Sequence, residues 1–320
     1  MKMFGRIMAI IGSLLLMILL FLVGVILILE YGPSKTARNL FVTSAMETSA
    51  GKFMATLFIP KKTINEIQKA NSVEDVNDIT DSTLIDINNE TVDKDRIDIT
   101  EINESTYHGY LATIYDPSRV MVGISGEYGP SHKGKQVVEM AKKYNATLAT
   151  NAGGFSDYNG TGNGGIPKGV VISEGKIRYS AGSEYPLIGI DKNNKLVVGK
   201  MSAKKAIDMG VRDAVSFGPI LIVNGKPSKV NGTGGGLNPR TVIGQRKDGA
   251  ILLLVTEGRQ ANSLGATMLD VQNLMIKLGA ENAANLDGGS SSLMYYKGEY
   301  INDCASLIGP RDMPTAIIVK

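Results

Sequence analysis

The chain has 320 residues, enough for at most about two domains, and 43% of them are hydrophobic, enough to bury a sizeable core. One cysteine excludes an internal disulfide, and one cysteine with two histidines excludes a zinc cluster built from such residues. Any catalysis must therefore use carboxylates, hydroxyls, arginine, lysine or backbone amides. The net charge of +3 divides into +5 over residues 1–70, −9 over 71–104 and +7 over 105–320.

An uncharged apolar segment lies near the N-terminus. Residues 7–29 are 23 residues without a charged side chain, and a helix of that length spans about 34 Å, enough to cross a bilayer. Lys2 and Arg6 precede the segment and Glu30 follows it, so the positive-inside rule places the N-terminus in the cytoplasm. We predict a single-pass anchor in the cell membrane over residues 1–30, with the rest of the chain extracellular. A cleaved signal peptide is the alternative.

Residues 31–104 are expected to join this anchor to the main domain. Apolar residues recur at steps of three and four between Val42 and Leu57, which predicts one helix over 34–58 with Ser34 as N-cap and Pro60 as stop. This helix either lies on the membrane surface or packs against the domain. The acidic stretch 71–104 predicts a solvated spacer that holds the domain away from the membrane, with short strands as the alternative.

Residues 105–320 are predicted to form one catalytic domain of the α+β class, mixed and rich in strands. Short apolar runs separated by Gly, Asn and Pro indicate strands. Helical periodicity and length occur in only two segments of this region. The strands are expected near 110–115, 120–124, 147–150, 187–190 and 251–255, and the helices over 134–144 and 265–278.

Several familiar sites lack the context that they need. The glycines between 160 and 165 fit G-x-G-x-x-G, but Pro167 follows where a helix should begin, so dinucleotide binding is not expected. His108 and His132 lie in or near predicted turns, and G-x-S-x-G is absent, which argues against a serine hydrolase. Nucleic acid is not expected as a partner, because only 6% of residues are aromatic and no compact basic stripe is present.

One loop is a weak candidate for calcium. Asp157, Asn159 and Thr161 place oxygen atoms at the first, third and fifth positions of an EF-hand-like loop, and Gly162 follows at the sixth. Lys168 stands at the twelfth position, where calcium requires a bidentate glutamate. We therefore predict no firm metal site and no resident cofactor, and leave a divalent cation open.

The strongest signal lies at the ends of predicted strands. An apolar run brings Asp287 to the edge of a sheet, and the glycine pair that follows allows backbone N–H groups to approach an anion or a sugar. Residues 238–241 precede a second strand, and Glu257 and Arg259 follow a third. Carboxylates and guanidinium groups at several strand ends suit a phosphorylated substrate that is rich in hydroxyl groups.

At these residues the sequence resembles the phosphodiester glycosidase family, over about 145–319. The resemblance rests on seven short motifs that occur in the same order along the chain. They are Asn151-Ala152-Gly153-Gly154-Phe155, Gly165-Ile166-Pro167-Lys168-Gly169, Phe217-Gly218-Pro219, Asn238-Pro239-Arg240-Thr241, Glu257-Gly258-Arg259-Gln260, Leu286-Asp287-Gly288-Gly289-Ser290-Ser291-Ser292 and Arg311-Asp312-Met313-Pro314.

The resemblance implies hydrolysis of a glycosidic bond whose leaving group is a phosphate diester, which releases a free sugar and a phosphomonoester. Arg240 is then the first candidate for holding the phosphate. Asp287 is the candidate for the essential carboxylate, which steers water or stabilises an oxocarbenium-like centre, and Glu257 for the second carboxylate. The substrate-binding candidates come from the same motifs: Asn151, Gly154, Thr241, Arg259, Gly288, Gly289, Ser291 and Arg311.

Three departures from the family pattern predict a different sugar pocket from that of the family's animal member. Ala152 interrupts the first motif, and Glu257 stands where the family commonly has aspartate. Ser290 replaces a commoner glycine.

The sequence thus predicts an extracellular, membrane-anchored phosphodiester glycosidase. Its expected partner is a phosphorylated glycan of the cell envelope, such as a teichoic-acid-like or phosphopolysaccharide chain, which the +7 charge of residues 105–320 would attract. Two alternatives remain, a non-catalytic module that binds an anionic glycopolymer and a transferase of sugar-phosphate units.

Overall fold

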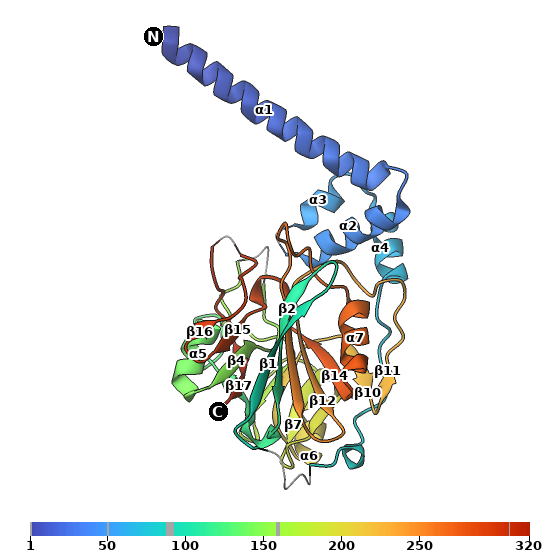
Figure 1. Cartoon of the computed structure of the whole chain (residues 1–320), viewed down its shortest axis with the longest axis vertical. Coiled ribbons are helices and arrows are strands. Elements are labelled where there is room, and N and C mark those ends of the chain that lie inside the picture. The colour runs from blue at the N-terminus through green and yellow to red at the C-terminus, as the bar shows by residue number, and fades with distance from the viewer. Residues whose placement is uncertain (1, 50, 88–92, 158–160, 307) are drawn as a thin grey trace.

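A strand-rich body carries a long N-terminal helix that projects away from it (Figure 1). The computed structural model describes residues 2–49, 51–87, 93–157, 161–306 and 308–320. The helices are α1 (Lys2–Tyr31), α2 (Lys35–Glu47), α3 (Lys52–Thr56), α4 (Lys61–Ala70), α5 (Val137–Tyr144), α6 (Ala203–Asp208) and α7 (Met268–Lys277).

The strands form three antiparallel sheets. The first has the order β1-β2-β13-β12-β14-β10-β11, the second β16-β15-β4-β17-β3 and the third β6-β5-β9-β7-β8. Their bounds are β1 (Ile97–Asn103), β2 (His108–Ile114), β3 (Val120–Ile124), β4 (Leu148–Asn151), β5 (Val170–Ser173), β6 (Lys176–Ser180), β7 (Tyr185–Asp191), β8 (Leu196–Met201), β9 (Val211–Ser216), β10 (Ile220–Val223), β11 (Lys226–Pro227), β12 (Arg240–Arg246), β13 (Ile251–Thr256), β14 (Ala280–Leu286), β15 (Met294–Tyr296), β16 (Glu299–Tyr300) and β17 (Thr315–Val319).

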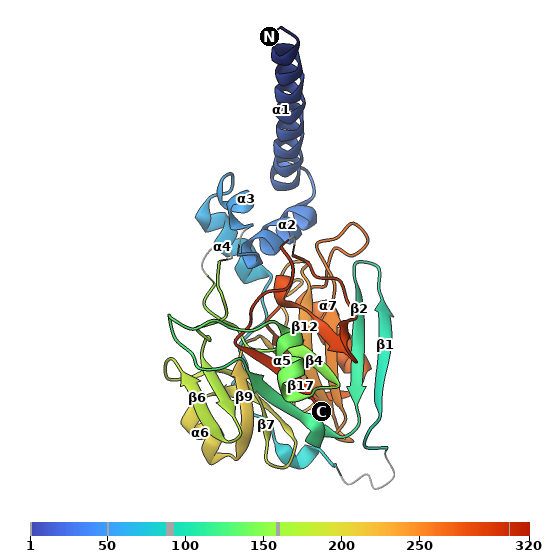
Figure 2. The same cartoon turned by 90° about the vertical axis from the view of Figure 1, so that its left-hand side faces the viewer.

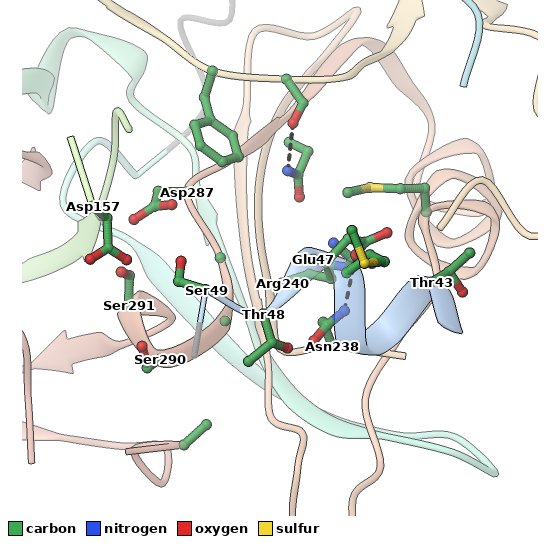
Figure 3. Close-up of a pocket in the computed structure, with 18 of the residues that line it drawn as sticks. Thr43, Glu47, Thr48, Ser49, Asp157, Asn238, Arg240, Asp287, Ser290 and Ser291 are labelled. Carbon is green, nitrogen blue, oxygen red and sulfur yellow. Dashed lines mark hydrogen bonds and ion pairs between the residues drawn. The ribbon is translucent and has the colours of Figure 1, made fainter. Parts of the chain in front are cut away.

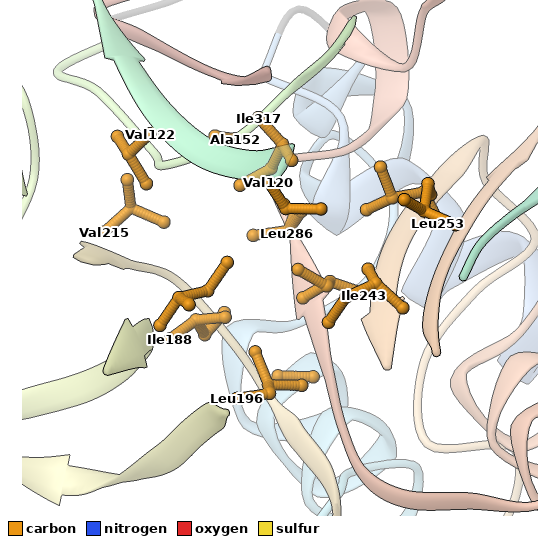
Figure 4. Packing of buried hydrophobic residues seen from close by; sticks show 14 of the residues in the cluster. Val120, Val122, Ala152, Ile188, Leu196, Val215, Ile243, Leu253, Leu286 and Ile317 are labelled. Atoms are coloured by element: carbon orange, nitrogen blue, oxygen red, sulfur yellow. The ribbon is translucent and has the colours of Figure 1, made fainter. Parts of the chain in front are cut away.

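One hydrophobic core joins the three sheets. Buried side chains from each sheet meet in it, among them Leu253 and Leu286 from the first, Ile317 from the second and Ile188 from the third (Figure 4). Core strands whose two faces are both buried have nearly continuous apolar sequences. In β13, for example, every residue is buried. The expected mixed α+β class is confirmed.

The two helices expected in the main domain are present as α5 and α7, each shorter than predicted. Local side-chain chemistry explains where α7 begins. Thr267 caps its first turn by accepting a hydrogen bond from the N–H of Asp270, whose carboxylate accepts one from the N–H of Thr267 in return. Helix α6 was not predicted from the sequence.

Helix α1 has the length and composition of a membrane span. Met3–Tyr31 reaches a mean hydropathy of 3.1 and its most apolar stretch makes no buried contact with the rest of the chain. A signal sequence near an N-terminus meets the same criteria, so the helix is consistent with both expectations for this segment.

The single helix expected over 34–58 is instead two helices, α2 and α3. Ser34 is the N-cap of α2, as predicted, with its hydroxyl 3.2 Å from the N–H of Ala37. The helix ends at Glu47 because Thr48 adopts an extended backbone conformation. Pro60 does not stop a helix but is the N-cap of α4. Proline has no backbone N–H, but none is needed at the start of a helix, and its φ of −58° is suitable there.

In the described part of residues 71–104, the expectation of a solvated spacer is wrong, and the alternative of a short strand is confirmed over 97–103. Residues 97–103 form β1, which pairs with all of β2 and thereby belongs to the first sheet. Further upstream, the N–H groups of Glu74 and Thr80 donate to the carbonyl oxygens of Lys229 and Val198. The described parts of the acidic stretch therefore lie along the domain, and β1, which precedes residue 105, belongs to the domain's first sheet.

As a result, helices α2, α3 and α4 lie between α1 and one end of the strand-rich body in both views (Figures 1 and 2). The same end of the body carries the functional site.

Candidate active site

The site is built where two paired strands end. β12 begins with Arg240 and β14 ends just before Asp287, and their antiparallel register pairs Thr241 with Leu286. The start of β12 and the end of β14 therefore lie next to each other, at the same end of these two strands; this end is called the edge of the sheet below. Arg240 and Asp287 both line a cavity of about 830 Å³ at this edge (Figure 3).

Asp287 carries a carboxyl group that lies deep in the cavity wall. Its Oδ2 is buried and has no hydrogen-bond partner among the described residues. Burial raises the pKa of Asp287 to about 6, although hydrogen bonds from Ser291 and from the N–H of Gly288 favour the ionised form. A carboxyl with this pKa accepts or releases a proton near neutral pH.

Asp157 supplies a second carboxylate to the cavity. Both of its oxygens accept hydrogen bonds from Arg311, each at 2.9 Å, and Arg311 stacks over the ring of Phe155 at 4.8 Å. Burial opposes ionisation of Asp157, but hydrogen bonds from Arg311, the N–H of Gly162 and Ser49 outweigh it and lower its pKa. The two carboxyl groups thus have pKa values that are shifted in opposite directions.

Two guanidinium groups, those of Arg240 and Arg259, form a positive cluster in the lining of the cavity. Arg240 is only 5% exposed, and its Nε and Nη2 donate to the carbonyl oxygens of Ala266 and Gly236. Arg259 donates to Oδ1 of Asn238 at 2.9 Å. Burial and the charge of Arg240 both lower the pKa of Arg259, so the cluster favours an anion that compensates two positive charges.

Three consecutive residues at the C-terminal end of α2, Glu47 to Ser49, bind three charged groups of this cavity. Oε2 of Glu47 lies 2.8 Å from Nη2 of Arg240 and 2.9 Å from Nδ2 of Asn238, and Oε1 accepts the N–H of Gly236 at 2.9 Å. Thr48 accepts a hydrogen bond from Arg259 at 3.0 Å. Ser49 hydrogen-bonds Asp157. In Figure 3, Thr48 and Ser49 lie between the Arg240 side and the Asp287 side of the cavity.

Seven of the eleven residues expected in the site line this cavity: Arg240, Arg259, Asp287, Gly288, Gly289, Ser291 and Arg311.

Glu257 does not line it. Its Oε1 accepts the N–H of Asp303 at 2.8 Å, and its own N–H donates to the carbonyl of His108. Because β12 separates β13 from β14, Glu257 is held away from Asp287. Among the described residues, the carboxylates that line the cavity besides Asp287 are Asp157 and Glu47, and Glu47 is paired with Arg240.

Asn151 and Thr241 also lie outside the cavity lining and act as structural supports. Asn151 donates to the carbonyl of Asp287, and its Oδ1 accepts from Thr241 at 2.9 Å and from the N–H of Leu293 at 3.2 Å. They therefore fix the strand end that carries Asp287. Gly154 is structural as well, because a Cβ there would lie 2.7 Å from the ring of Phe217.

The backbone N–H groups of Gly288 and Gly289 were expected to approach an anion or a sugar, but both are engaged within the protein. The N–H of Gly289 donates to the carbonyl of Pro239, and that of Gly288 to Asp287. Their amides thus shape the turn and are not directed at a bound anion.

The loop considered for calcium does not present a cation site in the described part of the chain. The carboxylate of Asp157 is held by Arg311, and Asn159 lies outside the described residues. No group of three or more His, Cys, Asp or Glu side chains able to hold a metal is found among the described residues.

The sequence analysis missed several residues that border the cavity. Asn238 and Phe217 belong to two of the motifs that the sequence shares with the family, so they could have been predicted as site residues from those motifs. Glu47, Thr48 and Ser49 were missed. The alternative that this helix packs against the domain is confirmed, but the sequence does not indicate which residues it contacts, and these lie about 190 positions later.

Comparison with known proteins links the domain to a family. The sequence profile of phosphodiester glycosidases matches residues 144–320. YomE, an uncharacterized SPbeta prophage-derived protein of Bacillus subtilis, is 31% identical over 194 residues, which cover 59% of this chain and 30% of YomE. Human N-acetylglucosamine-1-phosphodiester alpha-N-acetylglucosaminidase is 24% identical over 222 residues, covering 62% of this chain and 42% of the human protein. This chain spans less than half the length of these two relatives.

A solved structure shares the fold. The catalytic domain of the zebrafish N-acetylglucosamine-1-phosphodiester alpha-N-acetylglucosaminidase, described as auto-inhibited by its pro-peptide, superposes with a TM-score of 0.56. The likeness covers 70% of this chain and 82% of the zebrafish chain at 24% identity.

Replacing Asp287 by asparagine is expected to stabilise the protein at neutral pH. Because the pKa of Asp287 is about 6 in the folded state and 3.8 ordinarily, its ionisation opposes folding as the pH rises through 6. The neutral amide removes this cost, so Asp287→Asn should raise the free energy of unfolding at pH 7.5 by up to about 3 kcal/mol. Denaturant titrations at pH 7.5 and pH 4.5 test this.

The gain should shrink at pH 4.5, where Asp287 is already protonated in the folded protein. Asp75→Asn, at an exposed position, serves as the control and should change little at either pH. An equal gain at both pH values would contradict a buried charge as the cause.

Proposed function

We propose, since the chain belongs to the phosphodiester glycosidase family, that it hydrolyses the bond between a sugar and a phosphodiester. The products are the free sugar and a phosphomonoester. One observation carries the proposal, namely a buried carboxyl of raised pKa that shares a cavity with a guanidinium cluster. The carboxyl suits proton transfer and the cluster suits an anionic leaving group.

In the proposed mechanism, Asp287 acts as a general base on water. The water oxygen forms a bond to the anomeric carbon while its proton passes to Asp287. The bond between that carbon and the phosphate oxygen breaks, and its electron pair stays on the phosphate. Arg240 and Arg259 bind this charge, so the leaving group needs little help from an acid.

The charge of the cavity supports an anionic substrate. Five basic and three acidic side chains are among the described residues that line it. One of the acids, Glu47, comes from the N-terminal segment and compensates Arg240. Without Glu47 the excess of positive charge is larger, which favours a phosphate group at this position.

The location and the natural substrate are also part of the proposal. Helix α1 would anchor the chain in the cell membrane, with the strand-rich domain outside the cell. The substrate would then be a sugar-phosphodiester in a phosphorylated glycan of the envelope. The +7 charge of residues 105–320 supports this choice, because it favours encounter with a polyanion.

Hydrolysis of N-acetylglucosamine 1-(methyl phosphate) by the full-length protein in detergent tests the activity. We expect kcat/KM to rise about tenfold per pH unit below pH 6 and to level off above it, because the base must be ionised. Release of sugar is followed by mass spectrometry at each pH.

Asp287→Asn should lower kcat by at least about a thousandfold, whereas Asp75→Asn should leave it unchanged. A rate that falls as the pH rises through 6 would indicate an acid in place of a base. Intact polymer binding without turnover would support a binding module, and lengthened products would support a transferase.

We further propose that residues 47–49 limit access to the site. The carboxylate of Glu47 occupies the donors that would bind the substrate phosphate, while Thr48 and Ser49 engage Arg259 and Asp157. The zebrafish enzyme domain, described as auto-inhibited by its pro-peptide, supports the proposal. Here the occupying segment begins with the last residue of α2, the helix that follows α1.

Glu47→Gln is expected to lower KM for the same probe by roughly fivefold to tenfold. The neutral amide binds Arg240 less strongly, and losing about 1 to 1.5 kcal/mol from a charge-assisted contact gives that factor. Initial rates over a range of probe concentrations measure it. Glu66→Gln, on the exposed face of α4, is the matched control and should leave KM unchanged. A large fall in kcat with unchanged KM would mean that Glu47 is part of the catalytic machinery.

A further inference from the structure

The wall of the cavity next to Asp287 contains a second buried acceptor, on Asn285. Asn285 lies in β14 two residues before Asp287, which directly follows the last residue of that strand, and both residues line the cavity. Asn285 is only 1% exposed, yet it lines the cavity. It was not among the residues expected to bind substrate.

The amide of Asn285 is held in one orientation. Its Nδ2 donates to the carbonyl of Gly218 at 2.9 Å, and its backbone N–H donates to the carbonyl of Pro219 at 2.9 Å. A flipped amide would place Oδ1 against the Gly218 carbonyl oxygen, and two acceptors repel each other. Oδ1 is therefore fixed as an acceptor.

Neither this acceptor nor Oδ2 of Asp287 has a hydrogen-bond donor within reach in the described part of the chain. Buried polar atoms in folded proteins are nearly always paired, so an unpaired acceptor that lines a cavity indicates a ligand that donates to it. Two such acceptors on residues that line one cavity match a ligand with at least two donors. A sugar with neighbouring hydroxyl groups meets this requirement.

The surrounding side chains fit the rest of a sugar. Phe217, Pro219 and Met268 also line the cavity and present apolar surface. A sugar ring offers C–H groups on its faces and hydroxyl groups at its edge, so apolar surface beside buried acceptors matches it. Arg240 lies away from Asp287 across the same cavity (Figure 3), and Arg259 also lines the cavity, so a phosphate can be held beside the sugar.

We propose that Asn285 is a specificity-determining residue, whose Oδ1 accepts a hydrogen bond from one hydroxyl group of the bound sugar. This inference rests on the proposed function, since it assigns the sugar to the Asp287 side of the cavity. It predicts that the protein selects sugars that carry a hydroxyl at one particular position. The hydroxyl is recognised as a donor, so replacing it by hydrogen or fluorine removes the interaction.

Binding measurements test the inference separately from turnover. Isothermal titration calorimetry with the full-length protein in detergent would use N-acetylglucosamine 1-phosphate, glucose 1-phosphate and derivatives that each lack one hydroxyl. We expect one derivative to bind roughly 10- to 100-fold more weakly than its parent. In Asn285→Ala the parent should weaken by the same factor, and the difference between parent and derivative should vanish.

The loss of discrimination is a readout that a purely structural role would not produce. Asn285→Leu, which keeps the branched shape of the side chain but has no hydrogen-bonding atom, should give the same result if Asn285→Ala folds poorly. Asn282→Ala is the matched control, because Asn282 is a buried asparagine on the same strand that does not line the cavity and accepts the N–H of Asn224. It should retain the native ratio between parent and derivative.

Two results would overturn the inference. One is that the native protein binds none of these sugar phosphates, and the other is that Asn285→Ala and Asn285→Leu still discriminate between parent and derivative. Failure of the proposed function is a different outcome. In that case the sugars bind with the expected discrimination, but no phosphodiester of the same sugar is hydrolysed.

Discussion

The antiparallel pairing of β12 with β14 is the constraint on which the site depends. The register that pairs Thr241 with Leu286 places a buried arginine and a buried carboxyl at one edge of the first sheet. Asn151 maintains this arrangement, because it hydrogen-bonds both Thr241 and the carbonyl of Asp287. A shift of this register would move Arg240 and Asp287 relative to each other and direct their side chains to different faces. The core around Leu286 and Ile243 therefore contributes to function by holding the register.

The same edge concentrates charge that a folded protein normally keeps in water. Burial raises the pKa of Asp287 and lowers that of Arg259, and both shifts mean that the charged forms oppose folding. The N-terminal segment offsets part of this cost, since Glu47 compensates Arg240. Substrate phosphate would compensate the same charge. In the proposed function, stability and activity are thus linked through the ion pair of Arg240 with Glu47, a residue outside the matched family region.

The sequence predicted those parts of the structure that depend on local pattern. The apolar run before Asp287 and the motif around Arg240 identified two strand ends that do meet, and Ser34 marked the start of α2 correctly. Contacts between distant segments were not predictable. The position of Glu257 depends on strand order, since β12 lies between β13 and β14, and no local pattern encodes that order. The charge of residues 71–104 suggested a solvated spacer, but pairing with β2 and contacts along the domain outweighed self-repulsion.

The central claim is that water attacks the sugar carbon and that the phosphate leaves with its oxygen. Hydrolysis of N-acetylglucosamine 1-(methyl phosphate) in water enriched in oxygen-18, followed by mass spectrometry of both products, tests this directly. The account predicts that the label appears in the sugar and that the methyl phosphate is unlabelled. Label in the phosphate would show attack at phosphorus, and would contradict the roles assigned to Asp287 and to the guanidinium cluster.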